Sequence, residues 1–225
     1  MPNGFDAAIV VDVIRATTTA AFLLQAGAGK LLLADRLETA RRLARASAAL
    51  LAGERDGLPP PGFDLGNSPR EAALLKLDGR PVVMTTTNGT RATLRTAALV
   101  PNVALGALVN AAAAARWATG YDSVLLVAAG RNGKLALDDA YTVGVIVSAL
   151  QRLSRARLGE GALLALKLAE NADAGVIAHS AAARALEKVG LERDVALCAN
   201  RDALRLVPIL RERSRVSLTF EGAVF

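Results

Sequence analysis

Residues 8–19 read Ala8-Ile9-Val10-Val11-Asp12-Val13-Ile14-Arg15-Ala16-Thr17-Thr18-Thr19, an apolar β-like run that meets three threonines and then a helical pattern. A second segment of the same design reads Pro81-Val82-Val83-Met84-Thr85-Thr86-Thr87-Asn88-Gly89-Thr90. The first N–H groups of a helix lack internal partners and the helix dipole favours negative charge, so such junctions suit anions. Alternatively, the threonines only end two strands and cap two helices. The repetition, with Asp12 and Arg15 in the first segment, favours a pocket for an anionic substrate.

Apolar runs and helical patterns alternate along the chain. The patterns predict strands at 8–13, 30–34, 82–84, 103–105, 123–128 and 216–220. They predict helices at 17–26, 37–51, 89–98, 111–118, 137–153, 163–189 with a break near 171–175, and around 202–206. This alternation predicts an α/β protein with helices on both sides of a largely parallel sheet. Residues 1–225 are long enough for a single domain, and two lobes with the site between them remain an open alternative.

Composition excludes several classes of function. The formal net charge is +6, but the basic residues are scattered among acids and only 4% of residues are aromatic, so we expect no nucleic-acid partner. No apolar run is long enough for a membrane helix, and no room for a signal peptide precedes the first strand, so we expect no membrane partner. The single cysteine, Cys198, excludes an internal disulfide and fits a cytoplasmic location.

Several unusual loops are expected at one edge of the sheet. In open α/β sheets, ligands bind beyond the carboxyl ends of the strands. The loops at 12–19, 85–90 and 130–133 would lie there. The loop at 53–57 is expected to follow a helix instead, which makes its place in the site less secure. Residues 58–69 form a long proline-rich segment, and irregular segments of this length are often functional.

Carboxylates and arginines lie in or near these loops. The acids that could serve as hard oxygen ligands for magnesium are Asp12, Glu54, Asp64, Asp138 and Asp139. Asp12 interrupts a buried run, so a cation or a hydrogen-bond donor must satisfy it. Guanidinium groups that could hold a phosphate belong to Arg15, Arg55 and Arg131, although each alone could equally form a surface ion pair. The lone histidine, His179, and Cys198 lack the neighbours of a catalytic triad or a reactive thiol, so we expect neither to be catalytic.

The same residues resemble those of the 2-phosphosulfolactate phosphatase family. The matching pieces, in order, are residues 12–19, Gly53-Glu54-Arg55, residues 62–69, residues 85–90, residues 128–133, Leu137-Asp138-Asp139 and Val207-Pro208. The resemblance implies a three-layer α/β/α fold with a largely parallel or mixed central sheet. It also implies a magnesium-dependent phosphatase that converts 2-phosphosulfolactate to sulfolactate and phosphate. The chain has Asp138-Asp139 where relatives usually have Glu-Asp, which shortens one carboxylate by a methylene.

We therefore assign roles to specific residues. The catalytic assignments are Asp12, Arg15 and Asp139, and the Mg²⁺ ligands are Asp12, Glu54, Asp64 and Asp139. The substrate-binding assignments are Thr17, Thr18, Arg55, Asn67, Ser68, Thr86, Thr87, Asn88, Gly89, Thr90 and Arg131. The expected partner is a small anionic phosphorylated substrate, and a homodimer is one option for the oligomeric state. Two alternatives stay open: a phosphatase of this fold for another small phosphorylated acid, and a non-catalytic anion-binding domain.

Overall fold

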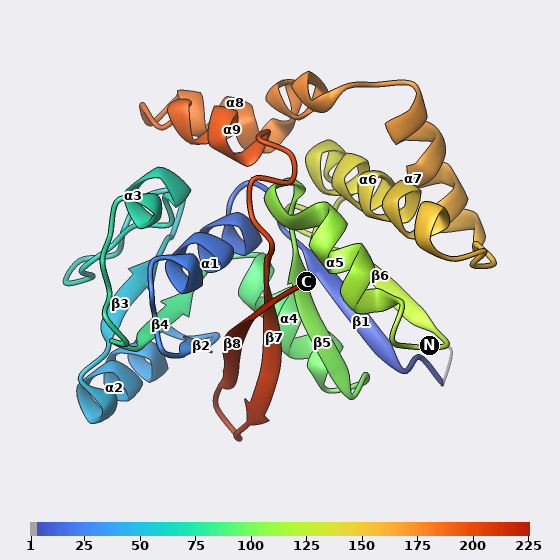
Figure 1. The fold of residues 1–225 in the computed structure, drawn as a ribbon. Helices are drawn as coiled ribbons and strands as arrows, with labels where there is room; N and C mark the ends of the chain where they lie inside the picture. The colour runs from blue at the N-terminus through green and yellow to red at the C-terminus, as the bar shows by residue number, and fades with distance from the viewer. Residues whose placement is uncertain (1–3) are drawn as a thin grey trace.

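The computed structural model describes residues 4–225 (Figure 1). Its strands are β1 (Ala7–Val11), β2 (Leu31–Leu33), β3 (Leu50–Gly53), β4 (Val82–Thr85), β5 (Asn102–Gly106), β6 (Val124–Ala128), β7 (Leu206–Arg213) and β8 (Leu218–Val224). Its α-helices are α1 (Ala16–Gln25), α2 (Leu37–Ser47), α3 (Pro69–Ala73), α4 (Gly89–Ala97), α5 (Ala111–Ala118), α6 (Leu137–Leu153), α7 (Glu160–Glu170), α8 (Ala181–Glu187) and α9 (Arg193–Cys198). Two 3₁₀ helices are η1 (Leu108–Asn110) and η2 (Ala174–His179).

Within the described residues, the strands form an eight-stranded mixed sheet with the order β3-β4-β2-β8-β7-β5-β1-β6. Strands β1, β5 and β6 are parallel to one another, and so are β2, β3 and β4. The β7–β8 hairpin pairs antiparallel with β5 on one side and with β2 on the other. Figure 1 shows this hairpin, in red, between the two parallel groups. The mixed sheet and its helical layers confirm the three-layer α/β/α prediction.

The twist of the sheet brings distant strand ends together. Strand β4 lies five steps from β1, and three of these pairings are antiparallel. A twist of about 20–25° at each step rotates β4 by about 100–125° relative to β1. Counted strand by strand through the sheet, β1 and β4 run in opposite directions. The accumulated twist turns them so that their carboxyl ends converge. The segments that follow β1 and β6 leave the sheet at the same level, because Val11 pairs with Ala128.

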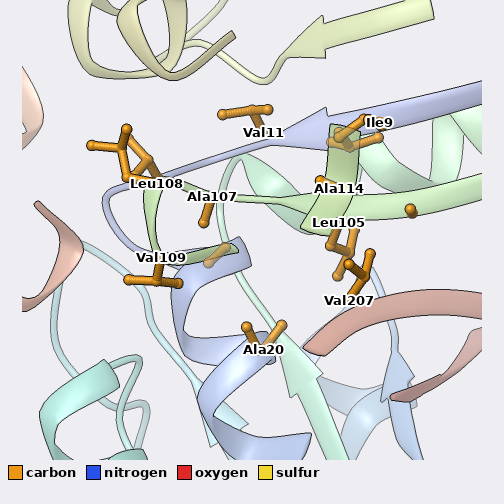
Figure 2. Close-up of a cluster of buried hydrophobic side chains, with 14 of the residues drawn as sticks. Ile9, Val11, Ala20, Leu105, Ala107, Leu108, Val109, Ala114 and Val207 are labelled. Carbon is orange, nitrogen blue, oxygen red and sulfur yellow. The ribbon is translucent and has the colours of Figure 1, made fainter. Parts of the chain in front are cut away.

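The core beside β1 is built from branched strand residues and small helix residues. Figure 2 shows Ile9 and Val11 of β1 near Leu105 of β5, with Ala20 of α1 and Ala114 of α5 close to the same cluster. All five residues are buried. Alanine on the helices allows their backbones to approach the sheet closely, which explains how an alanine-rich chain with few aromatic residues packs a full core.

The structure corrects the predicted helix at 37–51. Helix α2 ends at Ser47, Ala48 adopts a left-handed conformation with φ 49°, and strand β3 begins at Leu50. The leucines and alanines of β3 continue the pattern of the helix, so the sequence did not separate the two elements. As a consequence, loop 53–57 follows a strand and lies at the same edge of the sheet as the other candidate loops. The proline-rich segment 58–69 is irregular, as expected, and leads into α3 at Pro69.

The C-terminal region also differs from the prediction. The expected helix around 202–206 is absent from the described residues: Asp202 lies in a turn and accepts a hydrogen bond from the N–H of Ala112, at 2.7 Å, and β7 begins at Leu206. The expected helix at 163–189 is broken, as predicted, but into three pieces, α7, η2 and α8. Helix α9 was not predicted as a separate element. No helix among residues 4–225 is long and apolar enough to cross a membrane.

Candidate active site

The loops that follow four strands, β1, β3, β4 and β6, surround a cavity of about 180 Å³. Four loops and one helix contribute to its wall. The lining residues are Asp12, Ile14, Arg15, Glu54, Asp56, Gly57, Asn67, Thr87, Asn88, Arg131, Asn132, Ala182, Ala185 and Leu186. A larger cavity, of about 770 Å³, runs along β6, α6 and α7, but its wall is mostly apolar. The small cavity is the one in which acids, arginines and amides converge.

The first threonine triplet supports the cavity from within the protein. The hydroxyl of Thr17 donates to the carbonyl of Asp12 at 2.9 Å, and that of Thr18 donates to the carbonyl of Val13 at 2.7 Å. Both threonines are buried, and neither lines the cavity. They fix the turn between β1 and α1, so this placement does not favour the predicted direct contact of Thr17 and Thr18 with a substrate.

The threonines of the second triplet have different roles. Thr86 and Thr90 exchange hydrogen bonds: the Thr86 N–H donates to the Thr90 hydroxyl at 2.9 Å, and the Thr90 N–H donates to the Thr86 hydroxyl at 3.0 Å. This reciprocal pairing stabilises the start of α4. Thr87 and Asn88, in contrast, line the cavity. The Thr87 hydroxyl oxygen is buried without a hydrogen-bond partner among the described residues, which leaves it available to a ligand.

Gly89 lets α4 approach the β1–α1 turn. A Cβ atom at Gly89 would lie 2.7 Å from Oδ2 of Asp12 and 2.6 Å from Cβ of Ala16. Such distances are closer than carbon atoms tolerate, so any larger residue would push α4 away. Gly89 therefore serves close packing of the Asp12 carboxylate against the helix N-terminus, which places a negative charge at the positive end of the helix.

Asp12 is the central carboxylate of the cavity. It is 8% exposed, and the N–H of Ala16 donates to its Oδ1 at 3.4 Å. Burial raises its pKa to about 7, and repulsion from Asp138 and Glu54 adds to the effect, whereas the Ala16 N–H acts in the opposite direction. A cation bound nearby would lower the pKa of Asp12 again and keep its carboxylate ionised.

Asp138 is a second buried acid of the same cluster. Burial raises its pKa to about 6, and the charge of Arg131 acts against that rise. Its Oδ1 atom is buried and has no hydrogen-bond partner among residues 4–225. Asp138 does not line the cavity itself, although its charge acts on Asp12. A buried carboxylate oxygen without a donor calls for a cation or a proton.

Asp139 joins two of the loops. Its Oδ1 accepts the N–H of Val13 and its Oδ2 accepts the N–H of Gly130, both at 2.9 Å. Burial raises its pKa well above the ordinary value, with repulsion from Asp12 and Asp138, and the two N–H groups lower it. This geometry connects the ends of β1 and β6. It shows a positioning role more directly than the metal-ligating and catalytic roles that we assigned to Asp139.

Glu54 performs a similar task on the other side of the cavity. Its Oε1 accepts the N–H of Thr87 at 2.7 Å, and its Oε2 accepts the N–H of Gly57 at 3.0 Å. The preceding Gly53 has φ 144°, and a Cβ there would lie 2.0 Å from the carbonyl oxygen of Thr85. Glycine is required at this position, because β3 and β4 meet too closely for a side chain.

Asp64 lies apart from the other predicted metal ligands. Its Oδ2 accepts the N–H of Leu51 at 2.8 Å, near the start of β3, and Asp64 does not line the cavity. The structure therefore does not bring Asp64 together with Asp12 and Glu54. Its role here is to hold the proline-rich segment against β3.

The three predicted arginines differ in what they bind. Arg15 is buried and donates to Asp194 and to the carbonyl of Gly57, each at 2.7 Å. Arg55 donates to the hydroxyl of Thr85 at 3.0 Å and does not line the cavity. Arg131 lines the cavity, and within the described part of the chain its guanidinium forms no hydrogen bond or ion pair. Arg131 is therefore the cation most available to an anionic ligand.

Of the remaining residues singled out in the sequence, one lines the cavity and the others do not. Asn67 lines the cavity, and its Oδ1 is buried without a partner among the described residues. Ser68 does not line the cavity, because its hydroxyl donates to Asp194 at 2.7 Å and caps α3. His179 is exposed and Cys198 is fully buried, and neither lines the cavity. Burial raises the pKa of the Cys198 thiol, which fits the inert thiol that we expected.

Sequence reasoning missed two contributions to the site. Ala182, Ala185 and Leu186 present one face of α8 to the cavity and form an apolar wall over it. Their spacing of three and four residues is typical of a buried helix face and carried no sign of a ligand. The other is Asp194 of α9, which holds Arg15. No local pattern around Asp194 distinguishes it from a surface acid.

A magnesium ion fits the donors at this cavity. Among residues 4–225, no three His, Cys, Asp or Glu side chains are arranged as a complete metal site. Magnesium, however, needs only one or two carboxylates when water and phosphate oxygens supply the rest. Asp12 faces the cavity, and Asp138 offers an oxygen without a partner. These two acids are the residues that suit such an ion.

Together, the fold and the site define an α/β/α protein with a small polar cavity at its strand ends, lined by acids, arginines and amides. A family model described as 2-phosphosulpholactate phosphatase matches residues 2–213. A probable 2-phosphosulfolactate phosphatase of Thermus thermophilus is 46% identical over 222 residues, which cover 97% of this chain and 93% of the relative. Proteins with the same description from Deinococcus radiodurans and Thermotoga petrophila are 45% and 36% identical, over 91% and 90% of this chain and 88% of each relative.

The chain therefore belongs to the 2-phosphosulfolactate phosphatase family, and it is a phosphoric monoester hydrolase. A phosphorylated small molecule is consistent with the size and the donors of the cavity.

Proposed function

We propose that this protein is a magnesium-dependent phosphatase that hydrolyses 2-phosphosulfolactate to sulfolactate and phosphate. The observation that carries the proposal is that Asp12 and Arg131 line one small cavity, and that the charge of the buried acid Asp138 acts on Asp12. Among the described residues, the guanidinium of Arg131 has no partner. The names of the relatives, each described as a probable 2-phosphosulfolactate phosphatase, support the choice of phosphate ester.

The protein groups of the cavity suit a substrate with three anionic groups, a phosphate, a sulfonate and a carboxylate. Arg131 supplies a planar fork of donors that can bind a phosphate or a sulfonate through two hydrogen bonds. Thr87 and Asn88 add polar groups at the N-terminus of α4, where the helix dipole favours negative charge. Asn67 contributes a side-chain amide from the opposite loop. Phosphoryl transfer depends mainly on such positioning and electrostatic stabilisation.

Asp12 and Asp138 would hold the magnesium ion. When bound, the ion would neutralise charge on the phosphate oxygens that develops during cleavage. The two acids would be ionised in that state, because the nearby cation offsets the burial that raises their pKa values. Glu54 and Asp139 keep the loops in place through their hydrogen bonds to backbone N–H groups, so that Asp12 and Thr87 stay at the cavity wall.

A substrate panel tests the proposal. The purified protein with magnesium would be assayed for phosphate release from 2-phosphosulfolactate, from 2-phospholactate, which lacks the sulfonate, and from an aryl phosphate. We expect the highest kcat/KM for phosphosulfolactate. A higher value for a phosphorylated acid without a sulfonate would show a phosphatase with another substrate. No release from any of the three would point to a non-catalytic anion-binding protein.

A further inference from the structure

Asp194 is a buried acid outside the cavity that contacts two of the loops around it. It lies in the first turn of α9 and is 2% exposed. Its Oδ2 pairs with Nη1 of Arg15 at 2.7 Å, and its Oδ1 accepts the hydroxyl of Ser68 at 2.7 Å. Both carboxylate oxygens are therefore engaged by side chains from loops that are more than a hundred residues away in the sequence.

The contacts of Asp194 continue toward the cavity wall. Arg15 also donates from Nη2 to the carbonyl of Gly57 at 2.7 Å. The N–H of Gly57 donates to Glu54, whose other oxygen accepts the N–H of Thr87. Arg15, Gly57, Glu54 and Thr87 all line the cavity, whereas Asp194 does not. A continuous series of hydrogen bonds thus joins α9 to the N-terminus of α4.

We infer that Asp194 is a positioning residue of the active site, which fixes the guanidinium of Arg15 at the cavity wall. The side chains of this ion pair are each 3% exposed, so water cannot replace the carboxylate if it is removed. A buried guanidinium without its carboxylate is uncompensated and seeks another partner. Arg15 lines the same cavity as Asp12 and Glu54, so a reoriented Arg15 would disturb the charges of these two acids.

The inference deepens the proposed function and relies on it only in taking phosphate as the ligand. Helix α9 contributes no residue to the cavity wall, but through Asp194 it sets the affinity of the site for an anion. A purely structural role for Asp194 predicts something different: a lower melting temperature with unchanged affinity of the folded protein. Affinity and stability must therefore be measured on the same variants.

The test compares Asp194→Asn with Glu192→Gln. Both replace a carboxylate by an amide at the start of α9, but Glu192 is exposed and its side chain forms no hydrogen bond or ion pair among the described residues. The Kd of inorganic phosphate would be measured calorimetrically in the presence of magnesium, at a temperature where circular dichroism shows each variant folded. The loss of one fixed, charge-assisted contact predicts at least about tenfold weaker binding for Asp194→Asn. Glu192→Gln should stay within about twofold of the parent.

Binding of phosphate by folded Asp194→Asn with the parent's Kd would overturn the inference. If Asp194→Asn does not fold, Asp194→Glu decides, because it keeps the charge but moves the carboxylate by one methylene. We then expect weaker phosphate binding than in the parent, and an unchanged Kd would contradict the positioning role. Hydrolysis of phosphosulfolactate is scored separately, so a parent that binds phosphate without cleaving this ester would refute the proposed function and leave the role of Asp194 standing.

Discussion

At the scale of single residues, charge and burial separate the groups that face a ligand from those that build the site. Arg131 faces the cavity without a partner in the described chain, whereas Arg15 and Arg55 are bound to protein groups. The sequence predicted all three arginines as groups that could hold a phosphate, because each lies in or near a candidate loop. Their different partners come from residues distant in the sequence, Asp194 among them, and no local pattern reports such contacts.

Arg131→Lys should weaken substrate binding although the charge is kept. Lysine lacks the planar fork of donors, and the loss of a charge-assisted hydrogen bond costs about 1.5–3 kcal/mol, or roughly ten- to a hundredfold in KM. Steady-state kinetics on phosphosulfolactate measure the effect. Arg45→Lys, an exposed change on α2, is the matched control and should leave KM unchanged. An unchanged KM in Arg131→Lys would show that Arg131 is an ordinary surface charge.

His179→Ala and Cys198→Ser should leave kcat within about twofold of the parent, because neither residue lines the cavity. The two variants differ in stability: His179 is exposed, while Cys198 is fully buried and its replacement buries a hydroxyl. A lower melting temperature is therefore expected for Cys198→Ser alone. A large loss of kcat in either folded variant would mean that the active site lies elsewhere.

At the scale of elements, the sequence predicted the strand–helix units that carry the site and missed those that complete it. Strands β1, β4 and β6 were found because each is a compact apolar run followed by a helical pattern. Strand β3 was missed because its residues continue the pattern of α2. Strand β7 was missed because its first residues include Pro208, which is unusual inside a sheet. Only with β3 in place does Glu54 join the site.

Gly89→Ala should lower activity even though alanine favours helices more than glycine does. The added Cβ would meet Asp12 and Ala16 at less than 3 Å, so α4 must move away from the turn after β1. We expect kcat/KM to fall at least about tenfold, since misplacement by about 1 Å can cost a hundredfold.

Gly161→Ala in α7 is the control: its Cβ would meet nothing within 4 Å. That change should stabilise by up to about 1 kcal/mol and leave activity unchanged. Equal activity of both variants would contradict the close packing at Gly89.

At the scale of the whole molecule, the sheet and its loops concentrate buried acids at one point. The fold class and the family could be predicted from ordered motifs spread over most of the chain. The loops after β1 and β4 were expected at one edge because both strands were taken as parallel. The antiparallel hairpin between them, and the twist that still brings their ends together, could not be predicted, because the hairpin comes from the C-terminus. The single-domain prediction and the homodimer option stay predictions.

The acid cluster makes the stability of the metal-free protein depend on pH. The pKa values of Asp12 and Asp138 in the folded protein, about 7 and about 6, lie above those of an unfolded chain. The folded state therefore holds more protons between about pH 4 and pH 7, and stability falls as pH rises through this range. We expect the melting temperature without metal to be lower at pH 8 than at pH 5. Asp12→Asn should reduce that decrease by at least about 2–4 °C, the equivalent of roughly 1 kcal/mol. Parallel pH profiles of the parent and the variant would show that the pKa of Asp12 is not raised in the folded protein.

The magnesium dependence of the site is tested by phosphate release from 2-phosphosulfolactate, measured with magnesium and after exhaustive chelation. The same assay is repeated on Asp12→Asn, with folding checked by circular dichroism. We expect turnover in the parent with magnesium, and a loss of at least about a hundredfold both on chelation and in the variant. Full turnover by a protein verified to contain no metal, or by folded Asp12→Asn, would contradict a magnesium-dependent phosphatase site at Asp12.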